Sequence, residues 1–129
     1  MSVGLVIVTH GQAGKALIDV AEFILGESMS DIRHVAFSQS ALHTTGQQEL
    51  RNALQDSDQG HGILVMTDLI GASPANQVTK LLKEFNAVMV SGLNLAMLLR
   101  VWNYRDRPLN ILAGKAVEGG RRGIEVVRG

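Results

Sequence analysis

Two short segments of this chain are almost wholly apolar and rich in β-branched residues, and they restrict the possible folds more than any other feature. One runs from Val3 to Val8, and the other, GILVMTD, runs from Gly62 to Asp68. A strand of this composition is buried on both faces, as strands are in a parallel sheet that helices cover. We therefore predict that both segments are strands of such a sheet.

The segments around these strands complete an alternating pattern. Apolar residues recur at helical spacing from Ala13 to Leu25, and Gly26 supplies a stop signal. The other predicted elements are a strand at 32–37, a more polar helix at 42–54, a helix at 75–85 and a strand at 87–92. Strands that alternate with helices in this way form right-handed parallel crossovers. The predicted class is α/β, with an open, mainly parallel four-stranded sheet and helices on both faces.

The pattern changes after the fourth predicted strand. Residues 93–105 have helical spacing, and a further segment, 108–123, begins with Pro108 in the favoured first turn of a helix. The segment from Ile124 to Val127 is β-branched and follows a glycine-rich stretch, so we predict a last, edge strand there. An unpaired apolar edge strand would be a liability in a monomer. We therefore expect a homodimer in which this strand joins the sheet of the partner subunit.

Length, charge and cysteine content exclude several classes of protein. The 129 residues fit one domain, which we expect to span residues 1–129. Twelve basic and twelve acidic residues give a net charge of zero, which provides no field to gather nucleic acid or an anionic membrane. The chain contains no cysteine and no stretch apolar enough to span a bilayer. These features predict a cytoplasmic protein that does not bind nucleic acid.

Two polar residues lie where the two apolar strands end. His10 and Asp68 each follow a threonine, Thr9 or Thr67, and each precedes a glycine-bearing loop that opens a helix. Ligands and reacting groups gather at the carboxyl ends of parallel strands, so these side chains can touch if the strands are neighbours. A carboxylate that accepts the Nδ1 proton of an imidazole leaves the Nε2 lone pair free. His10 is therefore predicted to be an oriented nucleophile or base.

The loop after Asp68, with the sequence DLIGASPAN, adds a candidate anion site. We predict Ser73 as the N-cap of the next helix and Pro74 as its first residue, which directs free backbone N–H groups towards His10. Such helix starts bind phosphate, and Gly71 and Gly11 allow the backbone to come close. A nucleophilic histidine beside an anion cradle predicts phosphoryl transfer, which depends mainly on positioning and charge stabilisation.

Each of these residues also has a purely structural interpretation. His10 could be a polar cap of a strand, Asp68 could satisfy backbone N–H groups, and the loop could be an ordinary capped turn. Their joint placement at equivalent strand ends favours a site. We interpret His34 and His61 as structural or surface residues. His43 could line the rim of the site, but a structural role is favoured.

Two enzyme classes other than phosphotransferases can be tested on the same residues. Ser73, His10 and Asp68 supply the residue types of a serine hydrolase, but a nucleophile elbow requires glycine two residues after the serine, where this chain has Ala75. A metal enzyme needs a third ligand beside His10 and Asp68, and none is evident. We therefore predict neither a hydrolase nor a metal site, and no cofactor.

Three stretches together resemble the mannose-type enzyme IIA domain of the phosphoenolpyruvate-dependent sugar phosphotransferase system. They are GLVIVTHGQAGKALIDVAEFILG, ILVMTDLIGASPANQV and VSGLNLAMLLRVWNYR, and the similarity covers nearly the whole chain. The resemblance implies that His10 accepts phosphate from the histidine phosphocarrier protein HPr and passes it to an enzyme IIB protein. It also implies that Asp68 orients His10, that Thr9 and the Ser73 region hold the phosphoryl group, and that dimers exchange a strand.

The resemblance leaves two points open. The family usually has two glycines before the Ser-Pro pair, whereas this chain has Gly71 followed by Ala72. The same chemistry would also serve a phosphorylation-dependent regulator without transport, or the phosphotransfer subunit of a dihydroxyacetone kinase. As a phosphotransferase-system component, the protein would reach a membrane only indirectly, through a transporter complex.

Overall fold

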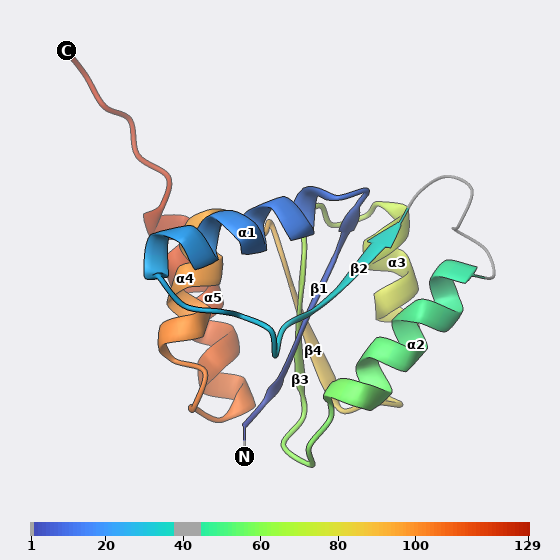
Figure 1. The fold of residues 1–129 in the computed structure, drawn as a ribbon. Coiled ribbons are helices and arrows are strands. Elements are labelled where there is room, and N and C mark those ends of the chain that lie inside the picture. The colour runs from blue at the N-terminus through green and yellow to red at the C-terminus, as the bar shows by residue number, and fades with distance from the viewer. Residues whose placement is uncertain (1, 38–44) are drawn as a thin grey trace.

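The computed structural model describes residues 2–37 and 45–129 and shows one parallel sheet between two layers of helices (Figure 1). The strand order is β2-β1-β3-β4, and all three strand pairs are parallel. In chain order the elements are β1 (Gly4–His10), α1 (Ala13–Leu25), β2 (Arg33–Phe37), α2 (Thr45–Ser57), β3 (Ile63–Thr67), α3 (Ser73–Thr79), β4 (Ala87–Ser91), α4 (Leu95–Asn103) and α5 (Leu109–Arg122). The predicted α/β class with an open four-stranded parallel sheet is confirmed.

The two apolar segments form the centre of the sheet, as their composition predicts. β1 and β3 pair with each other, and each has a further strand on its other side. Val6, Ile7 and Val8 are fully buried, and so are the residues of β3 from Ile63 to Thr67. β1 is longer than predicted and includes Thr9 and His10, because these residues pair with Ala36 and Phe37 of β2. His10 is thus the last residue of the strand.

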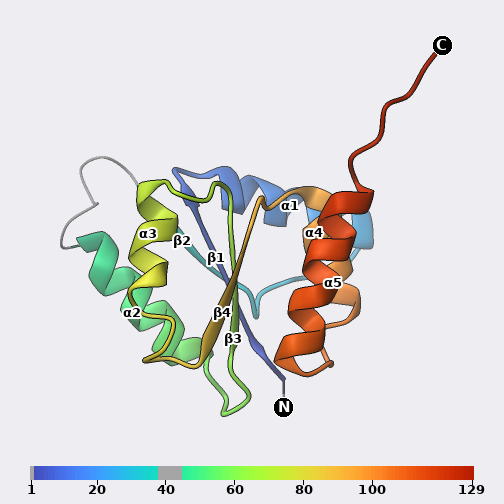
Figure 2. The ribbon, with the colours of Figure 1, turned by 180° about the vertical axis from the view of Figure 1, so that it is seen from behind.

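Alternation along the strands divides the core into two layers. Leu5 and Ile7 of β1 pack with α1, α4 and α5, whereas Val6 and Val8 pack with α2 and α3. Figure 2 shows these two helical layers on opposite faces of the sheet. Because side chains alternate along a strand, Thr9 and His10 face opposite layers. His10 is on the side of α2 and α3, and Thr9 is on the side of α1.

Two helices follow the capping signals in the sequence. α1 has the predicted bounds and ends at Gly26, which adopts the left-handed conformation (φ 69°) and donates its backbone N–H to the Glu22 carbonyl. α4 begins after Asn94, whose side chain accepts the Met97 N–H at 2.9 Å.

Other predicted bounds were wrong by one to several residues. α5 begins at Leu109, because Pro108 is its N-cap. α2 extends to Ser57, and residues 42–44 of its predicted range lie outside the described residues. α3 is shorter than the predicted helix at 75–85, since the chain after Thr79 turns towards β4. The apolar residues of this turn, including Leu81, Leu82 and Phe85, pack on the α2/α3 side of the core, and this packing explains their helix-like spacing.

The predicted edge strand at 124–127 is not part of the sheet of the described chain, and its expected place in the sheet of a partner subunit stays a prediction. Residues 124–129 form no regular element and extend away from the end of α5 (Figure 1). Gly123 keeps a right-handed conformation (φ −75°), so the chain does not reverse to run along β4. Ile124, Val126 and Val127 are exposed. Within the described residues, no helix is long and apolar enough to cross a bilayer.

Candidate functional site

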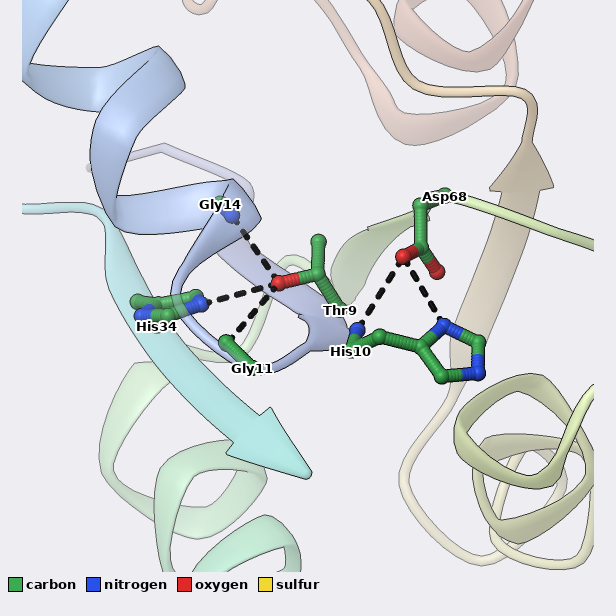
Figure 3. Close-up of polar contacts among 6 residues, drawn as sticks. All are labelled: Thr9, His10, Gly11, Gly14, His34 and Asp68. Atoms are coloured by element: carbon green, nitrogen blue, oxygen red, sulfur yellow. Dashed lines mark hydrogen bonds and ion pairs between the residues drawn. The ribbon is translucent and has the colours of Figure 1, made fainter. Parts of the chain in front are cut away.

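His10 and Asp68 meet at the carboxyl edge of the sheet, because β1 and β3 are neighbours. His10 Nδ1 lies 3.0 Å from Asp68 Oδ2, and the His10 backbone N–H donates to the same oxygen at 3.0 Å (Figure 3). A carboxylate accepts hydrogen bonds only, so Nδ1 carries the proton of the neutral ring. Nε2 then holds the lone pair and points away from Asp68 (Figure 3). The His10 side chain is 53% exposed, which leaves this nitrogen accessible.

The surroundings of Asp68 keep its carboxyl group ionised at neutral pH. Burial alone would raise the pKa of Asp68, but the two hydrogen bonds from His10 lower it, as does the positive charge of the His10 ring when it is protonated, and the net effect is a lowered pKa. The second oxygen, Oδ1, is buried and has no hydrogen-bond partner among the described residues. Asp68 therefore directs its negative charge at His10.

Gly11 turns the chain from β1 into α1. Its backbone N–H donates to the Phe37 carbonyl at 2.8 Å, and its φ is +47°. Apart from Gly11 and its two chain neighbours, no atom of the described residues lies within 4 Å of where a Cβ would stand, so the left-handed backbone favours glycine here. The turn leaves the space beside His10 free of side-chain atoms from this position.

The loop from Asp68 to α3 differs from the prediction at its cap. Ala72 is the N-cap, and Ser73 is the first helical residue, so the prediction of Ser73 as N-cap was wrong. Ala72 is extended (φ −85°) and its carbonyl accepts the Asn76 N–H at 3.0 Å. Any residue adopts this conformation, and glycine is therefore not required there. The backbone of Gly71 adopts the left-handed conformation (φ 82°), which favours glycine because it has no Cβ.

Thr9 lies beside His10 in sequence but is directed into the protein. It is fully buried, and its Oγ1 accepts the Gly14 N–H at 2.9 Å. The same oxygen lies 3.2 Å from His34 Nε2 and 3.5 Å from the Gly11 carbonyl (Figure 3). The structure thus places the Thr9 hydroxyl under the start of α1, and does not bring it together with the His10 ring.

His34, interpreted from the sequence as a structural or surface residue, lies half-buried beside Thr9. Burial lowers the pKa of His34, and the positive charge of Lys15 lowers it further, so the ring is neutral at pH 7. Its place on β2, opposite Ile7 of β1, brings it to Thr9. No local pattern marks it. Of the other histidines, His61 is exposed, and His43 lies outside the described residues.

Two exposed apolar side chains flank the site. Leu69 and Ile70 follow Asp68 directly and are 59% and 69% exposed. Two large apolar residues in a loop after a strand-end aspartate were a signal in the sequence for a contact surface. Among residues 2–37 and 45–129, no three His, Asp or Glu side chains are grouped so that they could hold a metal ion.

These features define an α/β protein with an open parallel sheet, whose carboxyl edge carries an exposed histidine bonded through Nδ1 to an aspartate of the next strand. The family model described as "PTS system fructose IIA component" matches residues 4–111. The chain belongs to this family of the sugar phosphotransferase system, and the resemblance seen in the sequence is confirmed.

Curated relatives agree with this assignment. The mannose-specific EIIAB component of the phosphotransferase system of Escherichia coli (strain K12) is 30% identical over 132 residues, which cover 99% of this chain and 40% of that protein. The chain therefore spans about two-fifths of the length of that relative. The fructose-specific EIIA component of Bacillus subtilis (strain 168) is 29% identical over 105 residues, or 81% of this chain and 71% of that protein.

Solved structures share the fold over the whole chain. A mannose/sorbose-specific IIA subunit from Enterococcus faecalis superimposes with a TM-score of 0.89 at 21% identity, covering 99% of this chain and 96% of that one. The EIIA component from Streptococcus agalactiae has a TM-score of 0.77 at 26% identity and covers 96% of both chains.

Proposed function

We propose that this protein is a phosphoryl carrier of the sugar phosphotransferase system that accepts phosphate on His10 from phospho-HPr and passes it to an enzyme IIB protein. The observation that carries the proposal is the 3.0 Å contact between His10 Nδ1 and Asp68 in a chain of this family. That contact leaves an exposed Nε2 lone pair as the attacking group. We take residues 1–129 as one such phosphotransfer domain acting in the cytoplasm.

The proposed transfer exchanges one P–N bond for another. His10 Nε2 attacks the phosphorus of the donor phosphohistidine, the new P–N bond forms, and the donor nitrogen leaves with the electron pair of the old bond. His10 becomes positively charged in this step, because Nδ1 keeps its proton. Asp68 stabilises that charge, since its oxygen already accepts from Nδ1 and its pKa is lowered.

Backbone groups near His10 are suited to hold the phosphoryl oxygens. The first turn of α3 has N–H groups without intrahelical partners, and Gly71 and Gly11 form the adjacent turns. In this proposal Gly11, Gly71 and Ser73 contribute through the backbone. Thr9 supports the turn through its buried hydroxyl, which accepts the Gly14 N–H at the start of α1.

Incubation with phosphoenolpyruvate, enzyme I and HPr tests the proposal. We expect one phosphate per chain, stable to base and labile to acid, which mass spectrometry of the digested protein locates on His10. A protein that stays unlabelled while HPr is phosphorylated would contradict the proposed function. Labelling of Ser73 by a fluorophosphonate would instead support the hydrolase alternative.

We also propose that two chains form a dimer through β4 and the C-terminal segment. β4 is at one edge of the sheet, and a groove of about 440 Å³ runs beside it, lined by Met89, Val90, Val117 and Ile124 among others. The exposed apolar residues of the segment 124–127 are suited to add a strand to such an edge. A two-fold exchange covers the segment and the edge of both chains.

Removal of the residues after Gly123 should convert the dimer into a monomer and lower its melting temperature, because both apolar surfaces then stay exposed. Sedimentation of the full chain and the truncated chain measures the change. A matched control replaces Glu125 with glutamine, which leaves the apolar residues in place and should leave the dimer intact. A monomeric full chain would contradict the dimer, and a truncated chain that still dimerises would contradict the role of the segment.

A further inference from the structure

Helix α1, which begins directly after the His10 turn, has no side-chain cap of its own. Gln12 is its N-cap and makes no side-chain hydrogen bond to the first turn. The Gly14 N–H of that turn donates instead to the Thr9 hydroxyl at 2.9 Å. Thr9 directly precedes His10 on β1, so this bond closes the chain from Thr9 to Gly14 into a loop. His10 and Gly11 lie inside this loop.

His34 forms a second contact with the Thr9 hydroxyl. Its Nε2 lies 3.2 Å from Thr9 Oγ1, and its ring packs on Gly14. A Cβ at Gly14 would lie 2.6 Å from His34 Cδ2 and 2.7 Å from Nε2, which is closer than atoms approach without movement. Glycine at this position therefore lets the ring reach the hydroxyl. This contact links β2 to the turn that carries His10.

The hydrogen-bond count is satisfied by a neutral His34. A threonine hydroxyl has one donor and two acceptor lone pairs. Thr9 Oγ1 donates to the Gly11 carbonyl at 3.5 Å and accepts the Gly14 N–H at 2.9 Å, which leaves one lone pair to accept from a protonated Nε2 of His34 at 3.2 Å. The lowered pKa of His34 agrees with an uncharged ring at this contact.

We propose that His34 is a positioning residue for phosphoryl transfer: through the Thr9 hydroxyl it fixes the turn from His10 to Gly14 and with it the direction of His10 Nε2. This inference rests on the proposed function. His34 is half-buried and lies on the face of the sheet opposite to the His10 ring, so it acts without contact with the phosphoryl group. Misplacement of a reacting group by about 1 Å can slow a reaction about a hundredfold.

A double-mutant cycle of His34 and Thr9 tests the proposal. His34→Phe keeps a ring against Gly14 but removes Nε2, and Thr9→Val keeps the shape of threonine but removes the hydroxyl. Each variant should lower the kcat of transfer from phospho-HPr about tenfold or more with little change in KM, because docking of HPr is untouched. The double variant should be no slower than Thr9→Val alone, because both substitutions remove the same hydrogen bond between Thr9 and His34. Thr9→Ser should restore most of the rate.

A His34→Phe variant that transfers phosphate as fast as the wild-type protein would overturn the inference, and so would effects of the two changes that simply multiply. Wild-type protein that takes no phosphate from phospho-HPr would contradict the proposed function itself. Long-range ¹H–¹⁵N NMR gives a second measurement. The Nε2 signal of His34 should shift in Thr9→Val relative to the wild-type protein, because the variant removes the hydroxyl that contacts this nitrogen, and an unchanged signal would overturn the inference.

Discussion

Replacement of His10 with alanine should abolish phosphorylation of this protein by phospho-HPr. In the described structure His10 combines an exposed ring, a carboxylate on Nδ1 and a free Nε2, and the variant removes the attacking atom itself. We expect no label above background after incubation with phosphoenolpyruvate, enzyme I and HPr, as measured by intact-mass spectrometry. The fold should persist, because the side chain is at the surface and contributes little to the core.

His61→Ala is the matched control for this experiment. His61 is exposed and lies in the loop before β3, far along the strand from the carboxyl edge, so its loss should leave labelling unchanged. Phosphate that persists in His10→Ala and maps to another histidine would contradict the assignment of His10 as the acceptor.

Replacement of Asp68 with asparagine should slow transfer about a hundredfold or more. The His10 ring loses its fixed tautomer, and it loses the negative charge that stabilises the positively charged ring during transfer. An amide can present its NH₂ group to Nδ1, which favours a proton on Nε2 and blocks the nucleophile. The fold should be retained, since asparagine has nearly the same shape. Single-turnover transfer from phospho-HPr measures the loss, and NMR of the phosphorylated wild-type protein should show phosphate on Nε2.

Acid pH offers an internal check on the same contact. The pKa of Asp68 is lower in the folded chain than its ordinary value, so the ionised carboxylate stabilises the fold above the unfolded pKa of about 4. That contribution is lost as the pH falls through the folded pKa. The difference in melting temperature between wild type and Asp68→Asn should therefore shrink at acid pH. Phosphate on Nδ1, or unchanged transfer in Asp68→Asn, would contradict the proposed geometry.

Local patterns in the sequence were sufficient for the framework of the fold. A strand buried on both faces needs a contiguous apolar run, and such runs mark β1 and β3 without reference to any other part of the chain. The bounds of α1 follow from its apolar spacing and from Gly26. Both strand ends carry their polar residues at the carboxyl edge of the sheet, and the contact of His10 with Asp68 then required only that β1 and β3 be neighbours.

Positions that depend on packing could not be found in this way. The length of α3, the cap at Ala72 and the direction of the C-terminal segment all follow from how the chain meets its neighbours. Ala72 is instructive, because it stands where the family usually has a second glycine, and only the structure shows that the backbone there is extended and suits alanine.

The sequence by itself determined the α/β class, the central strands and the two polar residues at their ends, because burial on both faces and helix stops are encoded in adjacent residues. Only the tertiary structure decided that Thr9 faces away from His10 and meets His34, which is 25 positions away along the chain. That contact depends on the strand order β2-β1-β3 and on the register that sets His34 opposite Ile7. A shift of one residue in this register would turn His34 to the other face of the sheet, and no local pattern specifies it.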